Sequence, residues 1–322
     1  MISVIVPAYN VAECIGRTLD SILAQSFPDL EIVVVDDGSQ DETGAVVDRY
    51  AVAYPDRIIA LHIPNGGVTN ARLTGVACAR GEWIGFVDGD DVIEQDMYAR
   101  LFANAQNHKA DISHCGYQMV FEDGRINYFH NTGVTHVHDR AEALRELLSG
   151  RQIEPGLWNK LFHKRLFSGL EMDRTIRINE DLLMNFYLFS AAERTVFEDW
   201  CPYHYMVRSS SVTRVLLNNH RIYDPIRVKE IIRNSVPAEL MREAQLAYLN
   251  TCIAIYHSLI TAGKGYRADI RKVRRMLQEE RKTWMLLGRK RMAMAQLIVY
   301  ASTLYVPVYL FYYRFFQRKV YT

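Results

Sequence analysis

The sequence predicts an α/β fold in which a doubly wound, mostly parallel sheet is followed by a helical C-terminal extension. Two observations lead to this prediction. Over residues 2–87, short β-branched runs alternate with amphipathic helical patterns, and from about residue 221 the pattern is helical to the end. Regular alternation of strands and helices is typical of parallel strands joined by right-handed crossovers.

The expected elements of the first part follow one another closely. Apolar runs predict strands over residues 2–6, 31–35, 58–63 and 83–87. Helical spacing of apolar residues predicts helices over residues 14–23, 41–54 and 68–79. The second run is apolar on both faces, which indicates a strand buried inside a parallel sheet. Ligands of such sheets bind beyond the carboxyl ends of the strands.

The middle of the chain is less regular. Strand-like runs at residues 112–119 and 195–198 mix with helical patterns at residues 140–148 and 181–192. We interpret this part as the second half of one domain, built on the same sheet. The predicted divisions are therefore residues 1–110, 111–220 and 221–322.

The composition excludes several classes of protein. The 322 residues suffice for a sizeable core, and 49% hydrophobic and 23% charged residues are ordinary for a folded chain. The net charge of +1 argues against a dedicated nucleic-acid binder. Five scattered cysteines without a CxxC pair argue against a disulfide framework or zinc site and favour the cytoplasm. The N-terminus lacks the basic segment of a signal peptide.

Two acidic clusters follow predicted strands. Residues 36–39 read DDGS and residues 88–91 read DGDD. Carboxylates this close repel one another unless a cation compensates, and Mg²⁺ or Mn²⁺ accepts such hard oxygen ligands. Asp88 and Asp90 share one side of an extended segment, and Gly89 lets a ligand approach the backbone. A metal here would neutralise a departing diphosphate; the alternative is a simple acidic turn.

Five sequence blocks together resemble family 2 of the inverting glycosyltransferases. They read SVIVPAYN at residues 3–10 with EIVVVDDGS at 31–39, NGGV and AR at 65–72, FVDGDD at 86–91, WNKLF at 158–162 and NEDL at 179–182. Each block alone is a weak signal, whereas the ordered set is specific. The resemblance covers residues 1–215 and leaves the last third of the chain outside it.

The resemblance implies a GT-A fold, a nucleotide-sugar donor, most often UDP-linked, and inversion at the anomeric carbon. Residues 1–110 would bind the nucleotide sugar, and residues 111–220 would bind the acceptor and carry the catalytic base. The residues implied in nucleotide-sugar binding are Pro7, Tyr9, Asp37, Arg72, Asp88 and Gly89.

The resemblance also assigns roles to single positions. Tyr9 would pack on the nucleotide base and Asp37 would hydrogen-bond to it. Arg72 would lie near the base or the phosphates, and Asp88 near the ribose or the donor sugar. Asp90 would bind the metal. For Tyr9 the alternative is a core aromatic at a strand end, and for Arg72 a solvated helix residue.

Asp181 is the predicted catalytic base, because a single displacement needs a group that takes the acceptor proton. Glu180 is the second choice for this role. Plain helix capping by acidic residues is the alternative for both. Trp158 would line the acceptor side or pack in the core, and Lys160 would pair with a phosphate or lie on the surface.

A further polar cluster follows the predicted base, at residues 203–212. His204 would be a third metal ligand or a packed histidine between two tyrosines. Arg208 would clamp the diphosphate. The spacing of the other histidines does not match a catalytic zinc site.

The C-terminal region combines basic and apolar segments. Residues 264–291 are strongly basic, and residues 292–316 are apolar and aromatic, interrupted by Pro307. Such a combination suits the inner face of a membrane with anionic lipids. Gln296, Ser302 and Pro307 make a poor spanning helix, so a helix lying in the interface is expected. The alternative is a core or dimer contact.

The sequence thus predicts a peripheral cytoplasmic enzyme at the inner face of the cell membrane. It would move a sugar from a nucleotide diphosphate to a hydroxyl of a saccharide or lipid-linked saccharide, with Mn²⁺ or Mg²⁺. An oligomer is compatible with the sequence. One alternative is a nucleotidyltransferase, which would need a glycine-rich basic loop where residues 7–10 read PAYN. The other is a non-catalytic saccharide binder, against which the intact Asp88, Asp90 and Asp181 argue.

Overall fold

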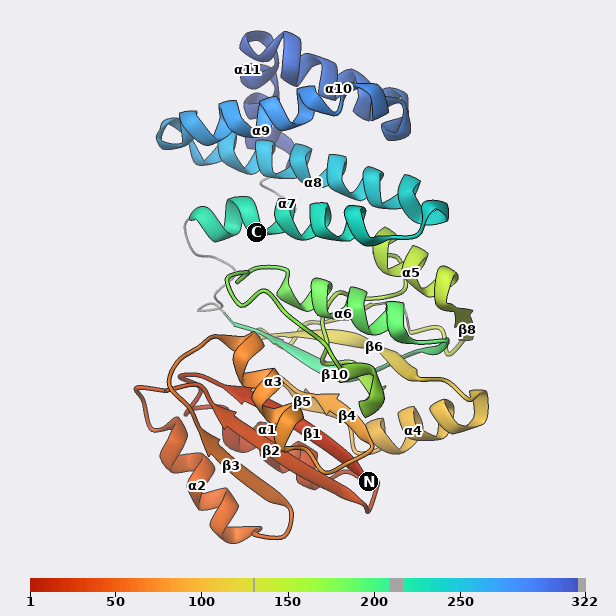
Figure 1. The fold of residues 1–322 in the computed structure, drawn as a ribbon. Coiled ribbons are helices and arrows are strands. Elements are labelled where there is room, and N and C mark those ends of the chain that lie inside the picture. The colour runs from red at the N-terminus through yellow and green to blue at the C-terminus, as the bar shows by residue number, and fades with distance from the viewer. Residues whose placement is uncertain (130, 209–216, 318–322) are drawn as a thin grey trace. The chain divides into compact units, whose positions relative to one another are not determined.

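The computed structural model describes residues 1–129, 131–208 and 217–317. The chain divides into two compact units, Met1–Arg214 and Val215–Thr322. Figure 1 shows the elements in chain order, from the strands of the first unit to the helices of the second.

Four parallel strands form the first half of the sheet, in the order β3-β2-β1-β4. Their bounds are Ile2–Ala8 for β1, Leu30–Asp36 for β2, Ile58–His62 for β3 and Trp83–Phe86 for β4. The connecting helices are α1 (Ile15–Leu23), α2 (Thr43–Ala53) and α3 (Val68–Cys78). The predicted alternation of strands and helices is confirmed, and β1 and β2 are buried along their whole length.

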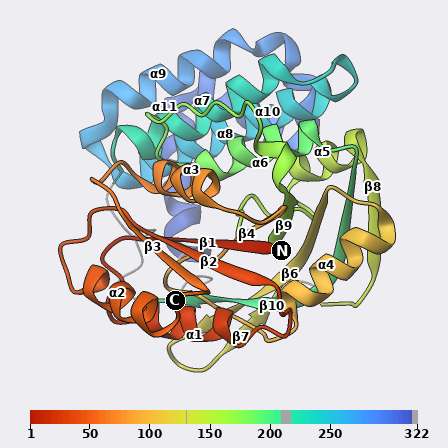
Figure 2. The same ribbon diagram turned by 60° about the horizontal axis from the view of Figure 1, so that its bottom comes forward.

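Helices cover both faces of this half of the sheet, with α3 on one side and α1 and α2 on the other (Figure 2). Alternate residues of β1 separate the two layers. Val4 and Val6 share a core cluster with Ile15 of α1 and Val47 of α2. On the opposite face Ile5 lies under α3. The double layer explains why the strand sequences are apolar on both faces.

The second half of the unit extends the same sheet with mixed strand directions. Strand β9 (Lys160–His163) runs antiparallel to β4 and to β6 (Ile112–Phe121). Strand β10 (Arg194–Val207) runs parallel to β6 and pairs with β5 (Val92–Ile93) and β8 (Thr135–Asp139). Strand β7 (Ile126–Tyr128) pairs with β6. The helices here are α4 (Met97–His108), α5 (Arg140–Ser149) and α6 (Glu180–Ala191).

Strand β10 is much longer than the strand predicted at residues 195–198. Its pairing with β6 shifts register between Glu198 and Tyr203. Pro202 lies within this irregular stretch and breaks the alternating pattern, so the sequence signal stops early although the strand continues.

The second unit is helical, as predicted. Its helices are α7 (Asn219–Ser235), α8 (Met241–Ala262), α9 (Arg267–Glu279), α10 (Gly288–Tyr300) and α11 (Ser302–Tyr312). They enclose a separate core around α8, in which Leu249, Cys252 and Tyr256 are fully buried. Among the helices that the structure describes, none is both long and apolar enough to cross a membrane.

The apolar segment at residues 292–316 has two different faces. Ala295, Ile298 and Tyr305 are buried in the core of the second unit. Leu304, Val308 and other large apolar side chains are instead exposed. Pro307 lies inside α11 and does not end it. The segment is therefore partly core and partly an exposed apolar surface.

Candidate active site

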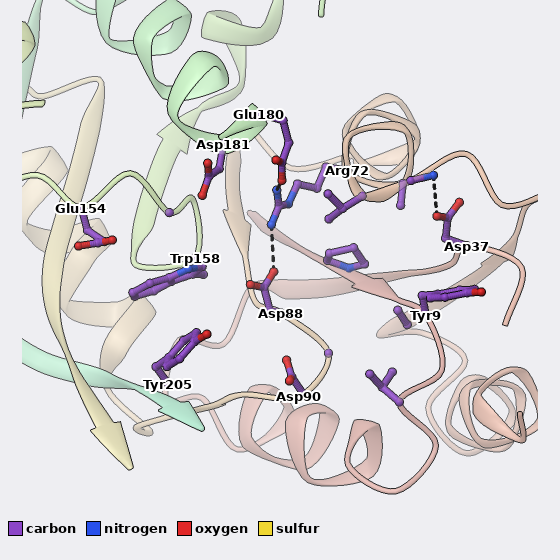
Figure 3. A pocket seen from close by; sticks show the side chains of 18 of the residues that line it. Tyr9, Asp37, Arg72, Asp88, Asp90, Glu154, Trp158, Glu180, Asp181 and Tyr205 are labelled. Atoms are coloured by element: carbon purple, nitrogen blue, oxygen red, sulfur yellow. Dashed lines mark hydrogen bonds and ion pairs between the residues drawn. The ribbon is translucent and has the colours of Figure 1, made fainter. Parts of the chain in front are cut away.

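A cavity of about 770 Å³ opens at the carboxyl ends of β1, β2 and β4, where the sheet topology predicts a ligand. Figure 3 shows its side chains, which come from both halves of the first unit. The predicted site residues among them are Pro7, Tyr9, Asp37, Arg72, Asp88, Gly89, Asp90, Trp158, Glu180 and Asp181. Three predicted residues, Lys160, His204 and Arg208, do not line it.

One end of the cavity is formed by Tyr9 and Asp37 (Figure 3). The Tyr9 side chain is 46% exposed, so the core alternative for this residue is wrong. The Asp37 carboxylate accepts hydrogen bonds from the backbone N–H groups of Gly66 and Gly67, both at 2.8 Å. Asp37 therefore fixes the loop that leads into α3, which carries Arg72.

Arg72 lies at the centre of the cavity wall and is 5% exposed. Its Nη2 donates to Asp88 Oδ1 at 3.1 Å, and its Nη1 lies 3.5 Å from Glu180 Oε1. The solvated alternative for Arg72 is therefore wrong, because α3 turns this side chain inward. Nε and Nη1 of Arg72 are buried without a hydrogen-bond partner. Such unused donors on a buried cation suit an anionic ligand.

Glu180 and Asp181 are the first two residues of α6; Glu180 points toward Arg72, and Asp181 points into the cavity beside it (Figure 3). Asp181 Oδ1 accepts the backbone N–H of Leu182 at 2.7 Å. Burial and the neighbouring Asp181 raise the pKa of Glu180 to about 7, against the opposing effect of Arg72. Burial also raises the pKa of Asp181, while Arg72 and the Leu182 N–H lower it. Glu180 is thus placed to exchange a proton near neutral pH, and Asp181 is a stronger proton acceptor than an ordinary aspartate.

The three carboxylates after β4 have different surroundings. Asp91 is buried, with Oδ2 accepting from the Tyr203 hydroxyl at 2.7 Å and Oδ1 from Met206 N–H at 2.8 Å. Asp88 and Asp90 face the cavity instead. Burial and the charge of Asp88 raise the pKa of Asp90. A cation beside Asp90 would relieve both effects.

The donor set fits a divalent cation only in part. In the described part of the chain, no three His, Cys, Asp or Glu side chains form a metal-binding group. Asp88 Oδ1 is already engaged by Arg72, so Asp90 is the less committed of the two carboxylates. Mg²⁺ and Mn²⁺ are commonly held by one or two carboxylates together with substrate phosphates. Asp90 fits a cation of that kind, whose other ligands would be phosphate oxygens and water.

His204 and Arg208 lie near the acidic loop but outside the cavity lining. His204 Nε2 is 3.1 Å from Glu94 Oε1, so the structure pairs this ring with Glu94 and does not bring it to Asp90. Arg208 donates to the backbone oxygen of Asp90 at 3.1 Å and to Cys14 Sγ at 3.0 Å. Arg208 therefore supports the loop that carries Asp90.

Gly89 lines the cavity, and close packing against other parts of the protein excludes a side chain at this position. A Cβ at this position would lie 3.1 Å from the backbone oxygen of Pro7 and 3.3 Å from side-chain atoms of Val11 and Ile15. The space beside Gly89 is thus occupied by the protein itself. The glycine lets the acidic loop pack on the end of β1.

Lys160 is fully buried, so its surface alternative is wrong. Its Nζ donates to the backbone oxygens of Glu154 at 2.8 Å and Gly156 at 2.5 Å, and to Asn159 Oδ1 at 2.7 Å. Burial lowers the pKa of Lys160 to about 8, against the opposing charge of Glu154. The ammonium group holds the segment that precedes Trp158 and does not reach the cavity.

Sequence reasoning missed several cavity residues, among them Tyr117, Glu154 and Tyr205. Trp158 packs between aromatic rings, with its centroid 4.9 Å from that of Tyr117 and 6.1 Å from that of Tyr205. Tyr205 belongs to the polar cluster after the predicted base, which was a usable signal. Glu154 has no such signal, because it precedes the recognised block and lies in a loop.

Comparison with known proteins identifies the family. A model described as glycosyl transferase family 2 matches residues 3–187. The chain belongs to this family. Over 228 residues it is 35% identical to the uncharacterized glycosyltransferase EpsJ of Bacillus subtilis, covering 67% of this chain and 63% of EpsJ. It is 33% identical over 221 residues to glycosyltransferase GlyA of Streptococcus pneumoniae, covering 66% of this chain and 32% of GlyA. The matched regions span less than two thirds of either relative.

Solved structures support the same fold. The family 2 chain superimposes on S. aureus TarS 1–349 in complex with UDP-GlcNAc with a TM-score of 0.68 and 20% identity. The match covers 97% of this chain and 91% of that structure. The predicted α/β fold class, with its GT-A-like sheet and helical C-terminal part, is thereby confirmed.

Proposed function

We propose that this chain is an inverting glycosyltransferase that moves a sugar from a UDP-linked donor to a hydroxyl of a saccharide or lipid-linked saccharide. One observation carries the proposal. A single cavity joins Asp88 and Asp90 at the end of β4 to Glu180 and Asp181 at the start of α6. The choice of UDP is supported by the TarS complex with UDP-GlcNAc.

The chemistry follows from the positions of these groups. Asp181 accepts the proton of the acceptor hydroxyl while the hydroxyl oxygen bonds to the anomeric carbon. The bond from that carbon to the diphosphate breaks, and the nucleotide leaves with its electron pair. One displacement of this kind inverts the anomeric configuration. Glu180, which is paired with Arg72, would exchange protons with Asp181 between turnovers.

The diphosphate would lie against Arg72 and Asp90. The buried guanidinium of Arg72 has unused donors, which would bind phosphate oxygens. A divalent cation held by Asp90 would neutralise the charge that develops on the leaving oxygen. Tyr9 and Asp37, with Pro7 beside them, would hold the nucleotide at the other end.

The second unit supports a peripheral position at the inner face of the cell membrane. The exposed side of α11 and of the π-helical segment that follows it carries four large apolar side chains, Leu304, Val308, Phe311 and Phe315, with Arg314 exposed beside them. We call this surface the apolar stripe. Arg289, Lys290 and Arg291 at the start of α10 are also exposed. Apolar side chains with nearby cations suit an anionic lipid surface.

Ligand-dependent melting tests the proposed donor and metal together. UDP-sugars with Mn²⁺ should raise the Tm of the wild-type protein, because a ligand that binds only the folded state stabilises it. The Asp90→Asn variant should lose the part of the shift that depends on Mn²⁺. Asp56→Asn removes an exposed carboxylate in a turn outside the cavity and should behave as wild type. Wild-type protein that no UDP-sugar stabilises would contradict the proposed donor class.

A further inference from the structure

The end of the cavity far from Tyr9 and Asp37 is formed by a group of side chains of which only Trp158 has a predicted role (Figure 3). Glu154, Trp158 and Tyr205 line this end. In Figure 3 they lie on the opposite side of Asp88 from Tyr9, and Asp181 lies between them and Glu180. This end of the cavity therefore lies next to Asp181, the proposed base.

The wall here is aromatic and held in place. The Trp158 ring stacks on Tyr203 with centroids 4.4 Å apart, and Tyr203 is fully buried. Tyr117 meets Trp158 edge-on from another side. Aromatic faces are suited to the C–H face of a sugar ring, and a fixed ring loses little entropy on binding. The hydroxyl groups of that sugar would then need a polar partner nearby.

The carboxylate of Glu154 is such a partner. It lines the cavity, and among the described residues none donates a hydrogen bond to its side-chain oxygens. The pKa of Glu154 is raised, chiefly by burial and also by the charge of Asp181, although the charge of Lys160 opposes the shift. A part-buried carboxylate without hydrogen-bond donors is unfavourable, and sugar hydroxyls would supply those donors.

The position of Glu154 is fixed by two buried residues. Lys160 Nζ donates to the backbone oxygens of Glu154 and Gly156. Asn185 Nδ2 donates to the backbone oxygens of Pro155 and Gly156, the latter at 3.2 Å. Asn185 belongs to α6, the helix that begins with Glu180 and Asp181. The loop that carries Glu154 is thus tied to the helix that carries the proposed base.

We propose that Glu154 is a sugar-recognition residue whose carboxylate accepts hydrogen bonds from hydroxyl groups of a sugar ring lying against Trp158, with Lys160 as a positioning residue that holds it. The inference rests on the proposed function and names the chemistry of one substrate: a pyranose with free hydroxyl groups on its outer edge. The ring belongs either to the donor sugar or to the terminal sugar of the acceptor.

Two assays on Glu154→Gln distinguish these sources. The first compares the affinities of UDP and of UDP-GlcNAc, UDP-glucose and UDP-galactose in the absence of acceptor. The second measures UDP release from the best donor while the concentration of methyl glucoside or methyl galactoside is raised. Glu154→Gln keeps the size of the side chain and removes its charge, and Glu154→Asp keeps the charge and shortens the side chain.

We expect UDP itself to bind Glu154→Gln as it binds the wild type, because the nucleotide end is unchanged. If the ring is the donor sugar, UDP-sugar affinity should fall about tenfold, the effect of losing a charged hydrogen bond. If it is the acceptor sugar, donor affinity should stay constant and the KM for the glycoside should rise about tenfold. Glu154→Asp should show a smaller change in the same assay.

The inference is overturned if Glu154→Gln changes neither assay while the protein melts as the wild type does. Equal weakening of UDP and UDP-sugars would also overturn it, since that result indicates a structural role. A different result would contradict the proposed function itself: wild-type protein that neither binds UDP-sugars nor releases UDP from them. The Lys160→Met variant should weaken the binding of the same sugar that Glu154→Gln affects. The double variant should bind that sugar no more weakly than Lys160→Met alone. Additive losses would exclude the positioning role.

Discussion

Two adjacent carboxylates at the start of α6 differ in what they touch. Glu180 faces the Arg72 guanidinium, whereas Asp181 accepts the backbone N–H of its own next residue. Asn179 precedes the helix with a left-handed φ of 64°, and its side chain does not cap the helix; both acids lie in the first turn, as the capping alternative expects, and both also line the cavity. Both acids are therefore aimed at the cavity by the turn that precedes them.

The raised pKa of Glu180 predicts a pH-dependent effect on stability. Its pKa is about 7 in the folded protein and 4.5 for the ordinary group, so the folded state binds more protons between these values. The free energy of unfolding therefore falls as pH rises from about 4.5 to 7. Glu180→Gln should match the wild type in Tm at pH 4.5 and exceed it at pH 8, by on the order of 5 °C.

Melting curves of both proteins over this pH range check the prediction. Asp56→Asn serves as the control for removal of an acid and should track the wild type at every pH. A Tm difference that is the same at pH 4.5 and pH 8 would show that Glu180 is not buried as described.

At the scale of the element, the placement of α3 is decided by one glycine. A Cβ at Gly75 would lie 2.4 Å from Ile5 Cγ2. Helix α3 therefore packs so closely on β1 that only a glycine fits at this position. Arg72 lies one turn before Gly75 on the same helix. The contact between helix and strand therefore sets the depth at which the guanidinium enters the cavity.

Gly75→Ala should destabilise the protein by about 1–3 kcal/mol, the usual cost of overpacking a core. It should also weaken UDP-sugar binding, because α3 and Arg72 would have to move outward. Denaturant unfolding and ligand titration measure the two effects. Gly265→Ala is the matched control, since nothing lies within 4 Å of a Cβ there. Normal stability of Gly75→Ala would contradict the close packing.

The elements also show how far the sequence predicts the site. Asp37, Asp88 and Asp90 were predictable because each follows a strand of regular pattern, and parallel strands end at one edge. The burial of Lys160 was not predicted. A single lysine in an apolar strand does not indicate that three oxygen acceptors will surround its ammonium group. Glu154 was missed because its loop acquires its place only through contacts with α6.

At the scale of the whole molecule, each unit has its own core and its own proposed task. The first unit contains the entire cavity. The second unit contains the apolar stripe, which its own core leaves uncovered. The sequence predicted the composition of this surface. It did not predict which apolar residues would be buried, because helix periodicity alone does not say which neighbour covers a face.

The apolar stripe predicts binding to vesicles that contain anionic lipids. Val308→Ser with Phe311→Ser should reduce the bound fraction about tenfold, since both side chains would leave the lipid boundary. Vesicle sedimentation with and without anionic lipid measures this. The control is Val52→Ser, an 81% exposed apolar residue of α2. Unchanged vesicle binding, or a stripe that mediates self-association in sedimentation velocity, would contradict the proposed membrane contact.

The most direct test of the central claim is the turnover of Asp181→Asn with its donor bound. The substitution keeps the shape of the side chain and removes its capacity to take a proton. We expect UDP-sugars to raise the Tm of this variant as they do for the wild type, while sugar transfer falls by about 10²–10⁴-fold, the usual contribution of a general base. Transfer at the wild-type rate would show that the proton goes elsewhere and that the cavity is not arranged as proposed.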